Sequence, residues 1–193
     1  PLEVKNMWNS ILKPTLVLAL VCAVVAGSLA FVNDITQDII SQRTMEEQVQ
    51  FRKEVLREAD SFVEIEIEGA SDKVVGIYEG YSKDILAGYV LDVVTNGYGG
   101  AMSLTVGVDI EGKVTSIIIG DNNETPGLGL KVTEPEFLGQ FNEATVHDTL
   151  TIVSNKKAAN EIQGISGATK SANAVVDGVQ AALDTVNMLT GGN

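Results

Sequence analysis

The sequence predicts an α+β domain, built on an antiparallel sheet with flanking helices and preceded by one N-terminal transmembrane helix. Three observations support this class. An uncharged apolar run spans residues 15–32, segments with strand-like composition follow between residues 62 and 119, and an amphipathic helix is expected from Ala172 onward. Because helices flank the strands at both ends of the sequence, we expect the C-terminal helix to cover one face of the sheet.

The composition limits what the chain can bind. Its 193 residues are enough for one domain with a sizeable core plus an additional segment. The net charge of −13, with no basic stretch, argues against nucleic acid as a partner, because phosphate binding needs clustered cations. Cys22 and His147 are the only residues of their types, so we expect no metal site and interpret His147 as a surface residue.

The apolar run of residues 15–32 is long enough to cross a bilayer core of ~30 Å as a helix. Lys5 and Lys13 precede it, and acidic residues follow it. This asymmetry predicts a cytoplasmic N-terminus at residues 1–14 and an extracytoplasmic remainder, anchored in a bacterial inner membrane by a single pass. A cleaved signal peptide is the alternative, because residues 28–30 (SLA) resemble a cleavage site, but the run is longer than a usual signal core.

Residues 33–60 are rich in charge and in helix-forming residues, which predicts a stalk helix between the membrane and a domain at residues 61–193. We interpret its charged residues as the solvent-exposed surface of a linker helix without further function. The apolar residues at helical spacing are Ile35, Ile39, Met45, Val49 and Leu56.

Strand signals begin after the stalk. They cover residues 62–67, 73–78, 87–95, 102–110 and 113–119. Glu111 and Gly112 separate the last two segments, as in a tight two-residue hairpin. Residues 97–100 (GYGG) break the strands, and we interpret them as a loop that needs positive φ, with direct ligand contact as the alternative. A short helix at residues 136–141 and a last strand at residues 149–153 are expected next.

Residues 164–171 (GISGATKS) precede the C-terminal helix. The free backbone N–H groups and the positive dipole end of a helix start would suit a phosphate on this loop. The alternative is that Ser166, Thr169 or Ser171 merely caps a surface helix. The apolar residues of the helix fall within roughly a 140° arc; they are Val175, Val176, Val179, Ala182, Leu183 and Val186.

A second informative loop occupies residues 124–129 (ETPGLG). One proline fixes φ, and two glycines allow unusual torsions and a close approach of backbone to a ligand. The loop is therefore either a stiff turn or one wall of a pocket.

With both loops considered, the chain resembles the RnfG/NqrC family, the FMN-binding subunits of the Rnf and Na⁺-translocating NADH:quinone oxidoreductase complexes, and its compact length is more similar to RnfG. The resemblance covers nearly the whole chain, from the N-terminal anchor through residues 97–100 and the hairpin with Asp109 and Gly112. The ETPGLG loop followed by the SGAT loop of residues 166–169 is its most specific feature.

The resemblance implies a cofactor and its attachment site. In this family the final threonine of the SGAT motif carries FMN through a phosphoester bond made by a separate flavin transferase, and the matching residue is Thr169. This chain departs from the family at Gln163, where an acidic residue commonly stands three places before the motif serine. The cofactor-binding residues that we expect beside Thr169 are Ser166, Gly167, Ala168, Lys170, Glu124, Thr125, Gly127, Leu128 and Gly129.

The loop itself does not suggest catalysis. The Thr169 hydroxyl has no neighbouring His or Cys to activate it, so we expect no catalytic residue. Accepting a phosphate from an outside enzyme requires only exposure, and Lys170 is close enough in sequence to offset the added charge. The redox chemistry would belong to the flavin, while the protein sets its potential through hydrogen bonds, burial and nearby charge.

The function implied by the resemblance is that of a membrane-anchored electron-transfer subunit in an ion-translocating complex that resembles ferredoxin:NAD⁺ oxidoreductase. Its implied partners are the other membrane subunits of the Rnf complex, the flavin transferase and the membrane. We expect a redox subunit rather than an enzyme by itself. The alternative is a cofactor-free structural or sensory module, which would lack the flavin fluorescence that a covalent flavoprotein keeps after denaturation.

Overall fold

The computed structural model describes residues 12–191, with the side chains of residues 34–45 outside the described part. The chain divides into two compact units, Pro1–Glu47 and Gln48–Asn193. Helix α2 (Lys13–Val55) begins in the first unit and ends in the second.

The described part of the first unit consists mainly of α2 up to Glu47, and the N-terminal portion of this helix is apolar. Lys13–Asn33 has 21 residues with a mean hydropathy of 2.6, and none of its most apolar stretch is buried by the protein. A helix of this length and composition is consistent with a single-pass membrane anchor. No helix break separates the expected anchor from the expected stalk, and the helix ends at Val55 instead of residue 60.

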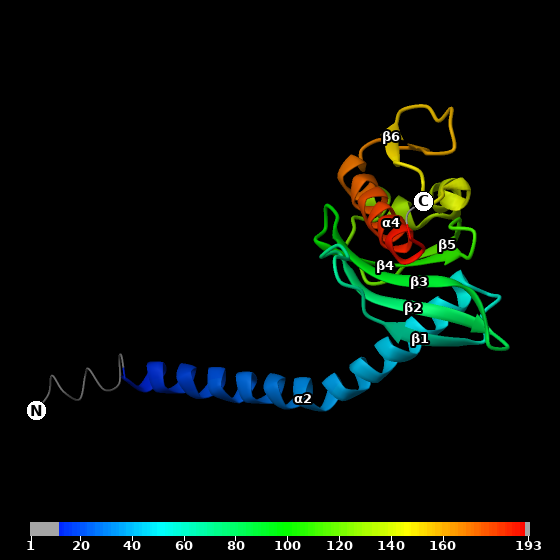
Figure 1. Cartoon of the computed structure of the whole chain (residues 1–193). Helices are drawn as coiled ribbons and strands as arrows, with labels where there is room; N and C mark the ends of the chain where they lie inside the picture. Colours follow the sequence, from blue (N-terminus) through cyan, green and yellow to red (C-terminus); the bar gives the residue numbers. More distant parts are fainter. Residues whose placement is uncertain (1–11, 192–193) are drawn as a thin grey trace, which may run out of the picture. The chain divides into compact units, whose positions relative to one another are not determined.

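The second unit is built on a five-stranded antiparallel sheet in which every strand pairs with its neighbour in sequence (Figure 1). The α+β class and the antiparallel sheet are therefore confirmed. The strands are β1 (Ser61–Ile65), β2 (Val74–Ser82), β3 (Ile85–Asn96), β4 (Ala101–Asp109) and β5 (Val114–Ile119).

Two helices cover the two faces of the sheet. The C-terminal helix α4 (Thr169–Leu189) packs on one face, and all of its predicted apolar residues are buried. Gly178 allows the close approach, because a Cβ at this position would lie 2.9 Å from Thr95 Cγ2 in β3. Side chains alternate in direction along a strand, so Val90 of β3 points to the other face, where it packs with Val55 at the end of α2 and with Leu56 directly after it.

The chain between β5 and α4 forms short elements. They are η2 (Gly129–Thr133), α3 (Pro135–Leu138), η3 (Gly139–Glu143), β6 (Thr151–Val153) and β7 (Glu161–Gln163). Of these, α3 and η3 contact β5, while η2 and β6 contact α4. Phe137 and Phe141 are buried with their ring centroids 5.7 Å apart, as the predicted short helix required. The predicted last strand is β6, but it pairs in parallel with β7 in a separate two-stranded sheet.

The β4–β5 connection differs from the two-residue hairpin that we predicted. The strands end at Asp109 and resume at Val114, so four residues connect them. Asp109 Oδ1 accepts hydrogen bonds from the N–H groups of Glu111 and Lys113, both at 2.9 Å, and Gly112 has φ +80°. The side-chain bonds of Asp109 stabilise this longer turn.

Candidate functional site

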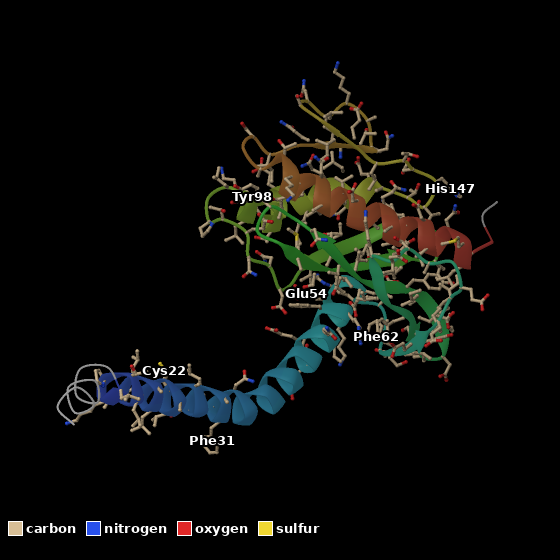
Figure 2. The ribbon with its side chains drawn as sticks, turned by 90° about the vertical axis from the view of Figure 1, so that its left-hand side faces the viewer. Cys22, Phe31, Glu54, Phe62, Tyr98 and His147 are labelled. Atoms are coloured by element: carbon tan, nitrogen blue, oxygen red, sulfur yellow. The ribbon has the colours of Figure 1, made fainter. Side chains whose placement is uncertain are left out.

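Three connections meet where α4 begins: residues 97–100 between β3 and β4, residues 120–129 after β5, and residues 164–168 before α4. Both views place the β3–β4 connection at this end of the second unit, and Figure 2 labels Tyr98 on it (Figures 1 and 2). All the predicted cofactor-binding residues lie on the second and third connections or in the first turn of α4.

The helix start has none of the side-chain caps that we considered as the alternative to a phosphate site. Ala168 is the N-cap residue, and α4 begins at Thr169 without a side-chain capping hydrogen bond. Thr169 and Lys170 are exposed. Among the described residues, no acceptor is bonded to the backbone N–H groups of Thr169, Lys170 and Ser171, whereas the Ala172 N–H donates to Ala168 O at 3.0 Å. Three backbone donors without acceptors therefore lie in the first turn of α4, which begins at the exposed Thr169.

The SGAT loop contacts the ETPGLG loop. A Cβ at Gly167, which has φ +79°, would lie 3.3 Å from Leu128 Cδ2. The Leu128 side chain is 48% exposed. Thr125 O accepts hydrogen bonds from the N–H groups of Leu128 and Leu130, both at 3.1 Å, and Gly127 has φ +78°. The ETPGLG loop is thus a compact turn, and its exposed Leu128 side chain lies against Gly167 of the SGAT loop.

Glu124 is a buried acidic residue of the site, with 6% of its surface exposed. Its Oε1 accepts a hydrogen bond from Gly99 N–H at 3.1 Å, and its Oε2 accepts one from Ser171 Oγ at 2.7 Å. The carboxylate therefore joins its own connection to the β3–β4 connection and to the first turn of α4.

The GYGG loop matches our interpretation only in part. Gly100 has φ +114°, as a loop that needs positive φ predicts, but Gly97 and Gly99 are not among the glycines with positive φ. Close contacts, and not positive φ, require glycine at these two positions. A Cβ at Gly97 would overlap with Glu124 Oε1, and a Cβ at Gly99 would overlap with Asn123 O. Tyr98 between them is 73% exposed.

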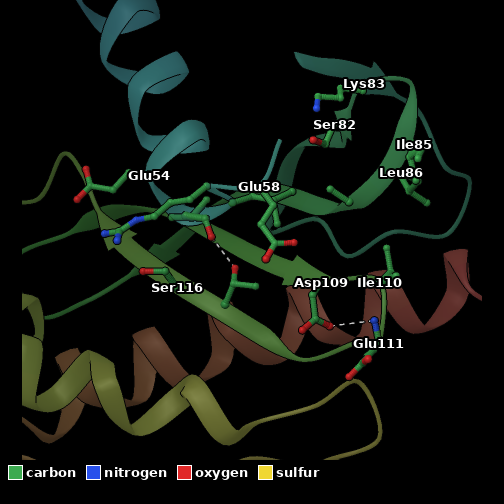
Figure 3. Close-up of a pocket in the computed structure, with 15 residues that line it drawn as sticks. Glu54, Glu58, Ser82, Lys83, Ile85, Leu86, Asp109, Ile110, Glu111 and Ser116 are labelled. Carbon is green, nitrogen blue, oxygen red and sulfur yellow. Dashed lines mark hydrogen bonds between the residues drawn. The ribbon is translucent and has the colours of Figure 1, made fainter. Parts of the chain in front are cut away.

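The second unit has two notable hollows in its described part. The smaller, of about 440 Å³, adjoins the SGAT loop and is lined by Gln163, Gly164 and Ile165 together with Lys131 and Lys156. The larger, of about 1050 Å³, lies between the end of α2 and the β2–β3 and β4–β5 turns (Figure 3). It contains none of the predicted cofactor-binding residues.

Sequence reasoning missed two interactions that shape the site. One is the bond from Ser171 to Glu124, for which residue spacing carries no signal. The other joins the side-chain amide of Gln140 to the backbone of Gln163: Gln163 N–H donates to Gln140 Oε1 at 2.7 Å, and Gln163 O accepts from Gln140 Nε2 at 3.3 Å.

Within the described residues, no group of three or more His, Cys, Asp and Glu side chains could hold a metal ion. His147 is exposed, as expected.

Comparison with known families agrees with these loops. A family model described as FMN-binding domain matches residues 97–184, which include all three connections, and one described as RnfG N-terminal region matches residues 6–55. The chain is 34% identical over 184 residues to the G subunit of the proton-translocating ferredoxin:NAD⁺ oxidoreductase complex of Clostridium ljungdahlii, covering 95% of this chain and 96% of that one. The chain belongs to the RnfG family, the FMN-binding G subunits of ion-translocating ferredoxin:NAD⁺ oxidoreductase (Rnf) complexes.

Other members of the RnfG family match over similar lengths. The G subunit of the Na⁺-translocating ferredoxin:NAD⁺ oxidoreductase complex of Acetobacterium woodii is 29% identical, covering 97% of each chain. The G subunit of an ion-translocating oxidoreductase complex of Methanosarcina acetivorans is 33% identical, covering 95% of this chain and 98% of that one. Like them, this chain is one member of a multi-subunit oxidoreductase complex.

A solved structure supports the fold independently of close sequence identity. The C subunit of the Na⁺-translocating NADH-quinone reductase of Parabacteroides distasonis superimposes with a TM-score of 0.59 at 19% identity, over 79% of this chain and 98% of that one. At this identity the similarity concerns the fold alone.

Proposed function

We propose that this chain carries FMN covalently, through a phosphoester bond to Thr169, and transfers electrons as a membrane-anchored subunit of the Rnf complex. The observation that carries the proposal is the start of α4, where Thr169 is exposed and the first three backbone N–H groups have no acceptor within the described residues. These donors and the positive helix end suit a phosphodiester. Lys170, also exposed, is placed to offset its charge.

The residues around Thr169 fit a bound flavin in other respects. Ser166 and Gly167 are exposed, Ala168 is buried, and Gly167 has the positive φ that a residue with a side chain rarely adopts. Leu128, which lies against the loop, and Tyr98 on the β3–β4 connection offer exposed apolar surface of the kind on which a flat ring can pack. FMN supplies the electron chemistry when bound, and the protein contributes attachment and surroundings.

Substitution of the hydroxyl-bearing residues of this loop tests the attachment site. The full chain is produced together with a flavin transferase. The Thr169→Ala variant should lose covalent FMN while remaining folded and membrane-inserted, because no hydrogen bond of the Thr169 side chain is formed within the described residues. Thr169→Ser should keep partial labelling, and Ser166→Ala should keep the bond. Peptide mass spectrometry locates the FMN; a flavin on Ser166 or Ser171 of the unmutated chain would refute the assignment.

A simple measurement distinguishes the electron-transfer role from a cofactor-free assembly role. The denatured full chain should give a flavin-fluorescent band on a gel, since only a covalent flavin survives denaturation. A band without fluorescence, after production with an active transferase, would favour the cofactor-free alternative.

A further inference from the structure

We propose that Glu124 is a positioning residue of the flavin site, whose buried carboxylate holds the loop of Tyr98 and the first turn of α4 in one fixed arrangement. The proposal rests on the proposed function for the role of Thr169. It assigns to Glu124 a role that is separate from contact with FMN.

Hydrogen bonds within the protein account for the burial of Glu124. A buried carboxylate costs free energy unless it is paired or hydrogen-bonded. Within the described residues Glu124 has no ion pair, so the Gly99 N–H and the Ser171 hydroxyl are its stabilising donors. Hydrogen bonds to a charged acceptor are stronger than neutral ones, so this pair of bonds is a strong link between the two loops.

Two glycines form the cradle in which this carboxylate lies, and a third lies against the backbone of Asn123 and Glu124. A Cβ at Gly97 would overlap with Glu124 Oε1, and a Cβ at Gly129 would overlap with Glu124 Oε2. A Cβ at Gly99 would overlap with Asn123 O and would lie 3.0 Å from Glu124 N. None of the three has positive φ, so the space taken by the Glu124 carboxylate and by the backbone of Asn123 and Glu124, rather than a turn conformation, requires glycine here.

The two donors lie next to the residues that matter for a bound flavin. Gly99 follows Tyr98, whose ring is exposed, and Ser171 is two residues after Thr169 in the same helical turn. Ser171 is fully buried, so its hydroxyl is directed inward to Glu124 while Thr169 faces solvent. Without the carboxylate, the loop of Tyr98 and the turn of Thr169 would move independently.

The first arm of the test needs no flavin. In the full chain in detergent, produced without a transferase, hydrogen exchange of the peptide spanning residues 97–102 reports on the Gly99 N–H. We expect Glu124→Ala to speed hydrogen exchange of the Gly99 N–H by about tenfold or more, because this N–H loses its bond to a charged acceptor. Glu124→Gln should largely restore protection, because its Oε1 can accept from Gly99 and its amide can donate to Ser171 Oγ.

The second arm uses the flavin-loaded chain. Glu124→Ala and Ser171→Ala should each shift the midpoint potential of the flavin and lower its fluorescence anisotropy, because each frees one loop from the other. The double variant should change both quantities no more than Glu124→Ala does, since the two side chains act through one link. Glu111→Ala, which changes an exposed acidic residue in the β4–β5 turn, is the matched control and should change neither.

The outcomes separate this proposal from the proposed function. Unchanged exchange at residues 97–102 in Glu124→Ala overturns the positioning role, as does a uniform rise of exchange over the whole sheet. If Glu124→Ala fails to fold, Ser171→Ala decides: a flavin potential and anisotropy equal to those of the unmutated chain overturn the proposal. Absence of FMN from Thr169 in the unmutated chain refutes the proposed function alone, because the exchange arm does not depend on it.

Discussion

At the scale of single residues, Gln163 occupies the place where the resemblance leads us to expect an acidic residue. It is exposed in β7, and both backbone groups are bonded to the side chain of Gln140. Within the described residues its own side chain forms no hydrogen bond. A substitution at this position should therefore leave the backbone that leads into the SGAT loop unchanged.

A substitution at Gln163 tests how a flavin transferase recognises the loop. We expect Gln163→Asp to raise the initial rate of FMN transfer to Thr169, because it supplies the missing acidic group without disturbing the bonds of Gln140. Gln163→Ala is the control and should not raise the rate. Mass spectrometry of the labelled peptide over time gives both rates, and equal rates for the two variants would show that the acidic group has no role here.

At the scale of secondary-structure elements, an ion pair links the end of α2 to β3 of the sheet. Arg52 Nη2 lies 2.7 Å from Asp92 Oδ2, and the two side chains are each only 12% exposed. Thr105 Oγ1 donates to Asp92 Oδ1 at 3.0 Å, and the Arg52 guanidinium lies 3.5 Å from the centroid of the Tyr78 ring. Burial raises the pKa of Tyr78, and the positive charge of Arg52 opposes that rise.

Breaking this pair should destabilise the second unit strongly. Arg52→Ala leaves the Asp92 carboxylate buried without its cation, and we expect the free energy of unfolding to fall by ~3–5 kcal/mol. The control is Lys73→Ala, which removes an exposed pair with Asp177 at 3.7 Å and should cost at most ~1 kcal/mol. Denaturant unfolding of the full chain in detergent, followed by circular dichroism, compares them. Equal losses would show that the burial of the Arg52 pair adds nothing to its strength.

The elements that sequence predicts correctly are those with a local pattern. The five strands and the buried stripe of α4 follow from periodicity within each segment, and the two loops from their glycines and proline. β7 has three residues and pairs in parallel with β6, so it has too few positions for a period to show. The Glu124–Ser171 bond joins residues 47 apart, and no local pattern encodes such a contact.

At the scale of the whole molecule, the anchor and the FMN-binding domain belong to one chain whose apolar helix segment, Lys13–Asn33, is long enough to cross a bilayer. We propose the boundaries expected from the sequence: a cytoplasmic N-terminus, a membrane span over residues 15–32, a stalk, and an extracytoplasmic domain from residue 61. Lysines before the span and acidic residues after it support this orientation. The tethered domain would then keep its flavin at high effective concentration beside the other subunits of the complex.

Cysteine labelling tests this orientation directly, because Cys22 is the only cysteine of the chain. In a Cys22→Ser background, a membrane-impermeant maleimide should label the Lys157→Cys variant in intact spheroplasts, since Lys157 is exposed on the second unit. The Lys5→Cys variant should be labelled only after the membrane is permeabilised. The reverse pattern would place the domain in the cytoplasm.

A mature protein that begins after Ala30 would instead show a cleaved signal peptide. Carbonate extraction would then release the domain, whereas an anchored chain stays with the membrane.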